Sequence, residues 1–100
     1  SDLKYKFGVV ISDFNKPIKN SKKSINRMKE LTKSGDECIV IGLNCKKFNI
    51  FKNSWEWINT ISHKDLLDKY KEIDTLIQDS HFESCSNVRI EGLFNGCQVI

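Results

Sequence analysis

The sequence predicts an α/β fold: a three-layer, Rossmann-like domain in which helices cover a mainly parallel sheet. Two observations predict this fold class. Residues 7–11 and 38–43 are continuous apolar runs, the pattern of strands that are buried on both faces, as strands of parallel sheets are. Between the two runs, residues 21–33 repeat apolar side chains at helical spacing. Strand, helix and strand in this order predict a βαβ unit, whose crossover is right-handed almost without exception.

The first half of the chain supplies this unit. The first strand is expected over residues 5–11, and a polar loop follows it. The helix is expected over residues 21–33 and ends at Ser34-Gly35, where glycine permits a left-handed turn. Its inward stripe consists of Ile25, Met28 and Leu31. The second strand follows at once, so we expect the two strands to be neighbours in the sheet.

The second half of the chain gives weaker signals. Asn53 with Glu56, and Ser62 with Asp65, fit capping boxes and predict the starts of two helices. Residues 73–77, IDTLI, fit either the end of the second of these helices or a third buried strand. Periodicity does not separate these two alternatives over so few residues.

The C-terminal segment is expected to form a hairpin. Residues 87–93 are interpreted as a strand. Asn95-Gly96 is a type I′ turn signal that leads into a final strand at residues 97–100. No repeat, low-complexity segment or linker interrupts the chain, so residues 1–100 are expected to form a single domain.

Composition narrows the classes of function. The chain is 39% hydrophobic and 29% charged, which is typical of a soluble globular domain. Its net charge of +3 is too small to indicate nucleic-acid binding. No apolar run approaches the ~20 residues that a membrane span requires, so no membrane partner is expected.

The cysteines and histidines predict no metal site and no cofactor. The four cysteines are Cys38, Cys45, Cys85 and Cys97. They form no CxxC pair, and neither His63 nor His81 has a companion at metal-ligand spacing. Cys38 lies in an apolar run and is expected to be a buried free thiol. With no signal peptide in the sequence, a reducing cytoplasm is the expected location.

A basic segment follows the first strand. A buried strand, a polar loop and a helix start are the parts from which α/β proteins build phosphate sites. Lys22 and Lys23 near a helix start cost a few tenths to ~1 kcal/mol unless an anion lies there. We therefore predict a phosphate or nucleotide site, whose candidate residues are Asn15, Asn20, Ser21, Lys22, Lys23, Lys46 and Lys47. The alternative is that the helix lysines form a solvated basic face and that the loop lysines, 46 and 47, serve solubility.

Two tryptophans lie close together in the chain. Trp55 and Trp57 cannot both face inward from one helix, because neighbours two apart point away from each other. One is expected in the core. Phe51 and Trp57 are the candidate anchors for a partner protein, since aromatic residues concentrate interface energy. A base-stacking platform is the rival interpretation.

Several short motifs carry a resemblance to a known family. Phe14-Asn15 follows the first strand, Pro17-Ile18 comes next, and Lys19-Asn20-Ser21-Lys22 stands at the predicted helix start. Gly35-Asp36-Glu37 precedes the second strand, and the loop 44–48 follows it. In this order the chain resembles the N-terminal half of the nucleotidylyltransferases marked by a T/HxGH motif, which include phosphopantetheine adenylyltransferases and glycerol-3-phosphate cytidylyltransferases.

The chain departs from the family at the motif itself. In the family, the motif histidines bind the triphosphate and stabilise charge at the α-phosphate. Here Lys19 and Lys22 hold their places, and Ser21 replaces the glycine. Lysine binds phosphate as a point charge but does not share a proton near neutral pH as imidazole does. The resemblance therefore implies a degenerate, inactive domain that binds a phosphate or nucleotide, or assembles with another protein chain.

Two alternatives remain open at this point. The first is a divergent but active cytidylyl- or adenylyltransferase in which Lys22 acts for the missing histidine, which leaves the question of enzymatic activity undecided. The second is a ferredoxin-like module that binds RNA, with Phe48 and Phe51 on a sheet face. This last alternative requires a mostly antiparallel sheet.

Overall fold

The two apolar runs form the centre of a parallel sheet. The computed structural model describes residues 3–15, 18–49, 54–78 and 86–100. Within them, the strands are β1 (Tyr5–Asp13), β2 (Cys38–Leu43), β3 (Glu56–Ile58), β4 (Ile73–Leu76) and β5 (Gln98–Val99). The strands form a single sheet in the order β3-β2-β1-β4-β5, and every pairing is parallel. The predicted α/β, Rossmann-like fold is confirmed.

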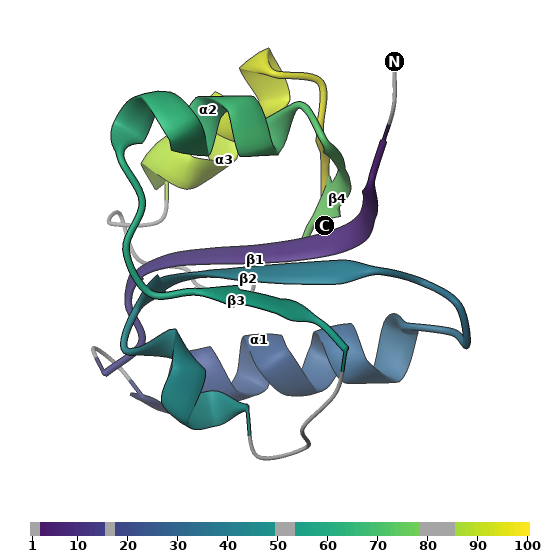
Figure 1. Ribbon diagram of the computed structural model, residues 1–100, viewed down its shortest axis with the longest axis vertical. Coiled ribbons are helices and arrows are strands. Elements are labelled where there is room, and N and C mark those ends of the chain that lie inside the picture. The colour runs from purple at the N-terminus through teal and green to yellow at the C-terminus, as the bar shows by residue number, and fades with distance from the viewer. Residues whose placement is uncertain (1–2, 16–17, 50–53, 79–85) are drawn as a thin grey trace.

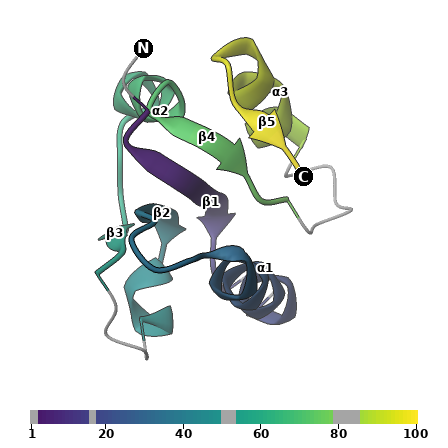
Figure 2. The ribbon, with the colours of Figure 1, turned by 90° about the vertical axis from the view of Figure 1, so that its right-hand side faces the viewer.

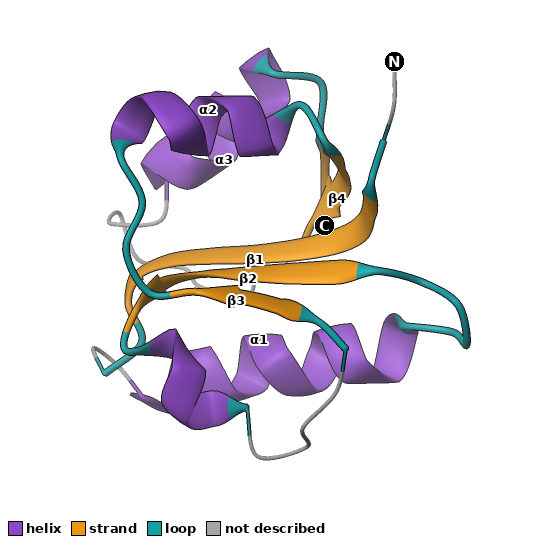
Figure 3. Ribbon diagram, viewed as in Figure 1, coloured by secondary structure: helices purple, strands orange, loops and turns teal. Residues whose placement is uncertain are grey.

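Helices cover both faces of this sheet, which gives three layers (Figure 1). The helices are α1 (Ile18–Leu31), the 3₁₀ helix η1 (Cys45–Phe48), α2 (His63–Tyr70) and α3 (Ser86–Phe94). Figures 1 and 2 place α1 on one face and α2 and α3 on the other. The same layers are seen in Figure 3, where the strands lie between the helices.

The strands are apolar on both faces because each face meets a helix layer. Beneath α1, one core cluster contains Val9, Phe14, Ile25, Met28, Cys38, Val40, Cys45 and Ile77. On the α2–α3 face, the other cluster contains Tyr5, Val10, Ile39, Ile41, Tyr70, Ile73, Leu76 and Cys97. Consecutive residues of β1 and β2 alternate between the two clusters, as strand geometry requires. Cys38 is a buried free thiol, as predicted.

Helix α1 begins three residues earlier than predicted and ends two residues earlier, at Leu31. Its buried face includes Ser21 and Ser24 in addition to Ile25 and Met28, whereas Leu31, which was also predicted to face inward, is exposed. The prediction counted only apolar side chains and therefore missed the first turn of this face. Lys22 consequently lies in the second turn of the helix.

The segment after residue 53 was predicted incorrectly. Residues 56–58 form strand β3 instead of a helix, and pair with β2 through Ile39↔Glu56 and Ile41↔Ile58. Asn53, the other half of the proposed capping box, lies outside the described residues. The second predicted helix start is confirmed, because the Ser62 hydroxyl accepts a hydrogen bond from the Asp65 backbone N–H at 3.1 Å.

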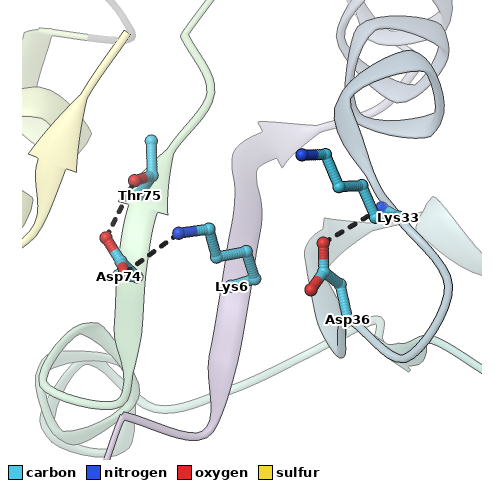
Figure 4. A network of polar contacts seen from close by, with 5 residues as sticks. All are labelled: Lys6, Lys33, Asp36, Asp74 and Thr75. Carbon is cyan, nitrogen blue, oxygen red and sulfur yellow. Dashed lines mark hydrogen bonds and ion pairs between the residues drawn. The ribbon is translucent and has the colours of Figure 1, made fainter.

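Of the two alternatives for residues 73–77, the strand is found, as β4. Lys6 and Asp74 tie this strand to β1: the Lys6 Nζ lies 3.5 Å from the Asp74 carboxylate, whose other oxygen accepts a hydrogen bond from Thr75 (Figure 4). After the C-terminal end of α1, the Asp36 carboxylate accepts a hydrogen bond from the Lys33 backbone N–H (Figure 4). These contacts are structural.

The predicted C-terminal hairpin is wrong. Residues 87–93 belong to helix α3, and β5 runs parallel to β4. Gly92 explains the close packing of this helix on the sheet, because a Cβ there would lie 2.2 Å from a Leu76 methyl carbon. Asn95-Gly96 ends the helix instead of turning a hairpin: the Cys97 N–H donates to the Gly92 carbonyl and the Gly96 N–H to the Leu93 carbonyl.

The ferredoxin-like alternative is also wrong, since it required a mostly antiparallel sheet. Phe48 lies in η1 and not on a central strand, and its ring packs against Phe14. Phe51 lies outside the described residues.

Candidate functional site

The carboxyl ends of all the strands meet at one edge of the sheet, because every pairing is parallel. Helix α1 follows β1 on one face, and α3 follows β4 on the opposite face (Figure 2). The strand order therefore reverses its direction between β1 and β4. In open α/β sheets, ligands bind outside the carboxyl ends of the strands near such a switch point.

A cavity of about 310 Å³ lies at this edge. It is lined by residues from the ends of β1 and β2, from the β3–α2 connection and from α2 itself: Val10, Ile11, Ser12, Ile41, Gly42, Leu43, Asn59, Thr60, Ile61 and Leu66. Most of this lining is apolar, and three side chains offer polar groups: Ser12, Asn59 and Thr60. We call this feature the carboxyl-edge cavity. Its size lies at the lower end of the range of small-molecule sites.

Gly42 shapes the floor of the carboxyl-edge cavity. Its φ is +152°, and a Cβ there would lie 1.8 Å from the Ile11 carbonyl oxygen and 2.7 Å from the Phe14 ring. The pairing of β1 with β2 becomes irregular between Val10 and Asp13, next to this contact. Glycine therefore allows the two strand ends to approach more closely than a side chain would permit.

Asp13 joins the loops that follow β1 and β2. Its Oδ1 accepts hydrogen bonds from the Asn15 backbone N–H at 2.9 Å and from the Asn44 side-chain amide at 3.2 Å. Asn44 itself adopts a left-handed conformation, with φ 66°. The Phe14 N–H donates to the Leu43 carbonyl at 2.9 Å and adds a backbone link between the same strand ends. Asp13 thus acts as a structural acceptor that fixes this edge.

Asn59 links the β3–α2 connection to η1. Its Oδ1 accepts a hydrogen bond from the Lys46 backbone N–H at 3.2 Å. The Cys45 Sγ lies 3.5 Å from the same oxygen and 3.3 Å from the Ile58 carbonyl oxygen. Burial raises the pKa of the Cys45 thiol, so the group is a neutral hydrogen-bond donor and a poor nucleophile.

The structure distributes the predicted phosphate residues over several places. Asn20, Lys22 and Lys23 line a shallow depression on the outer face of α1, together with Lys19, Asn26, Arg27 and Glu30. Lys22 and Lys23 are exposed, whereas Ser21 points to the core and is only 1% exposed. Asn15 lies at the β1–α1 connection, and its Oδ1 is buried without a hydrogen-bond partner among the residues that the structure covers.

Lys46 and Lys47 line neither the cavity nor the depression, although the Lys46 backbone N–H donates to the cavity residue Asn59. They are exposed residues of η1, and the Lys47 ammonium lies 5.9 Å from the centre of the Phe48 ring. The structure therefore does not bring the two loop lysines together with the lysines of α1.

Trp57 is half-buried and does not follow the helical geometry on which its prediction was based. Trp55 and Trp57 flank Glu56 at the start of β3, and residues two apart in a strand share one face. Their rings stack at 6.0 Å and pack against the core cluster beneath α1. The reasoning that one tryptophan must face outward was wrong.

Sequence reasoning missed the residues that line the carboxyl-edge cavity. Asn59 and Thr60 directly follow β3, but this segment was assigned to a helix, which hid the carboxyl end of a strand. Ser12 lies within β1, whereas the sequence analysis ended this strand at residue 11 and placed Ser12 in the polar loop. A strand assignment for residues 56–58 would have placed all three polar residues at one edge.

The described ranges contain no group of three His, Cys, Asp or Glu side chains that could hold a metal ion. None of the helices in these same ranges is long and apolar enough to cross a membrane. The family models, the curated proteins and the solved structures contain no match to this chain.

Proposed function

We propose that this chain is a nucleotide-binding α/β domain, with the ligand at the carboxyl edge of the sheet. One observation carries the proposal: a parallel sheet with the strand order of dinucleotide-binding folds has a mostly apolar cavity at the carboxyl ends of its first three strands. The base would occupy the carboxyl-edge cavity, and the phosphates would lie beside the N-terminus of α1.

The lining of the cavity supports the assignment to a base. Val10, Ile41 and Leu66 offer apolar surface to a flat ring, and these residues belong to the β1, β2 and α2 elements. Ser12, Asn59 and Thr60 add polar groups that hold a ring in one orientation. A few polar groups in a mostly apolar pocket are typical of small-molecule sites.

The start of α1 supports the assignment to phosphate. The helix has 14 residues and no acidic side chain in its first turn, while Lys19 there is exposed. The unpaired N–H groups and the dipole of a helix N-terminus attract anions. Helix α1 begins six residues after Ser12, which lines the cavity, so the two places are at most ~20 Å apart along the chain.

The resemblance to nucleotidylyltransferases agrees with this proposal and favours binding without turnover. Lys19 and Lys22 replace the two motif histidines, and Ser21, at the glycine position, is buried against the core. The lysines offer charge from one direction, whereas nucleotidyl transfer needs charge neutralisation around the whole phosphate. We expect nucleotides to bind and no pyrophosphate to be released from ATP or CTP.

Isothermal titration with ATP, CTP, UDP and GDP tests the proposal. Replacing Lys19 by alanine is expected to weaken nucleotide binding about twofold to fivefold, the contribution of one exposed ion pair with the phosphate. The control is Lys71→Ala, since this exposed lysine lies directly after α2 and pairs only weakly with Asp68. Absence of binding to all four nucleotides would refute the proposal, and pyrophosphate release would support the alternative of a divergent transferase.

A further inference from the structure

We infer that Asn59 selects the base of the nucleotide, and that the preferred base has a carbonyl group where its competitor has an amino group, as uracil does relative to cytosine. This inference rests on the proposed function, because it assumes that the base lies in the carboxyl-edge cavity. It adds a residue and a ligand class that the proposed function leaves open.

The orientation of the Asn59 amide follows from its neighbours. The Lys46 backbone N–H can only donate a hydrogen bond, so the Asn59 atom 3.2 Å from it must be the oxygen. The Cys45 thiol lies on the same oxygen side, at 3.5 Å. The other end of the amide is therefore the NH₂ group. Among the described residues, no hydrogen bond from this NH₂ group is found.

Asn59 lines the cavity, and the NH₂ group is the end of its amide that the Lys46 N–H and the Cys45 thiol leave unused. An amide NH₂ donates hydrogen bonds and accepts none. The other polar side chains that line the cavity, Ser12 and Thr60, are exposed hydroxyls that rotate to donate or accept as a ligand requires. Asn59 therefore differs from the two hydroxyl residues, because its NH₂ group can act only as a hydrogen-bond donor.

A hydrogen-bond donor at Asn59 would discriminate between bases of nearly equal shape, such as uracil and cytosine. Uracil carries an oxygen at the ring position where cytosine carries an amino group, and the two rings are otherwise nearly the same size. The oxygen would accept a hydrogen bond from Asn59. An amino group would bring donor against donor and leave both without a partner, which is more costly than a missing contact. The apolar floor formed by Val10 and Ile41 contacts both rings equally.

The test compares the dissociation constants of UDP and CDP on the unmodified chain by isothermal titration. We expect UDP to bind about tenfold more tightly, the ratio that corresponds to one unsatisfied buried donor. The Asn59→Asp variant retains an oxygen for the Lys46 N–H and replaces the NH₂ group by a second acceptor. We expect it to reverse the preference in favour of CDP.

The control for the added negative charge is Asn26→Asp, on the exposed outer face of α1. Such a charge repels both diphosphates alike and leaves their ratio unchanged. Equal affinities for UDP and CDP on the unmodified chain would overturn the inference while leaving nucleotide binding intact. An unchanged ratio in folded Asn59→Asp would overturn the role of Asn59. Failure of UDP and CDP to bind, with ATP or GDP still bound, would overturn the inference alone. Failure of ATP, CTP and GDP as well would refute the proposed function, and the inference with it.

Discussion

Replacing Gly42 by alanine should disrupt the edge of the sheet on which the candidate site depends. A Cβ at this position would lie 1.8 Å from the Ile11 carbonyl oxygen and 2.7 Å from the Phe14 ring. The first of these neighbours is backbone, so the conflict cannot be relieved by a change of rotamer. Strands β1 and β2 must separate locally, or the loop after β2 must move.

The expected cost has two parts. The backbone conformation of Gly42, with φ +152°, costs a residue with a side chain ~1–3 kcal/mol. Forcing an extra methyl group into a packed site adds ~1–3 kcal/mol. We therefore expect Gly42→Ala to lower the free energy of unfolding by about 4 kcal/mol, a large share of the ~5–15 kcal/mol that a domain possesses.

Gly35 provides a matched control. Its φ is also positive, at +93°, but no atom lies within 4 Å of a Cβ built there. Gly35→Ala should therefore show the backbone cost alone, about 1–2 kcal/mol. Urea denaturation followed by circular dichroism measures both variants. If Gly42→Ala costs no more than Gly35→Ala, the close approach of the two strand ends is not what requires glycine.

Three further predictions concern polar groups that are buried or half-buried. Tyr70→Phe should raise the free energy of unfolding by about 1 kcal/mol, because the Tyr70 hydroxyl is buried with no hydrogen-bond partner among the described residues. Tyr5→Phe should lower it by a similar amount, because the Tyr5 hydroxyl donates to Glu56 at 2.9 Å. Urea denaturation of both variants checks this, and equal effects would contradict it. Burial raises the pKa of Cys97 from 9.0 to about 11, so the folded state holds this proton more tightly than the unfolded state. The protonated Cys97 thiol therefore contributes its full stabilisation below pH 9, and this stabilisation is lost as the pH rises through 11. Thermal melts between pH 8 and 11.5 measure the loss, which should be smaller in Cys97→Ala. Asp13→Ala removes the acceptor of two hydrogen bonds and should cost about 1–2 kcal/mol in thermal denaturation, while an unchanged melting temperature would show that the carboxylate does not fix this edge.

The central part of the fold was predictable because its signals are local and strong. The apolar runs in β1 and β2 are continuous, as in strands that are buried on both faces, and the helix between them has one clear buried face. The cap of α2 was predictable for the same reason, since Ser62 and Asp65 meet within one turn. In each case, the residues that decide the structure are close together in the chain.

The edges of the sheet were not predictable from local patterns. Strand β3 has only three residues, and its extended form is stabilised by pairing with β2, which no pattern within residues 56–58 reveals. Helix α3 contains Val88 and Ile90, which favour strands, and its packing on the sheet brings Gly92 close to Leu76. Tertiary contacts therefore outweighed local propensity in both segments.

The candidate site was missed for a related reason. Its polar residues come from segments that are far apart in the sequence, and the Asn59 amide is oriented by Cys45 and Lys46, which lie more than ten positions earlier. The basic residues near α1 were visible in the sequence because they are adjacent. Their distance from the N-terminus of the helix depends on where the helix begins, which was predicted three residues too late.

The most direct test of the account is a map of backbone amide chemical shifts during titration with UDP. If a nucleotide binds at the carboxyl edge, the largest changes should fall on Ser12, Asn59, Thr60 and Ile61, with smaller changes in the first turn of α1. Changes confined to the outer face of α1, around Asn26 and Glu30, would place the anion on a basic surface and contradict a site at the strand ends.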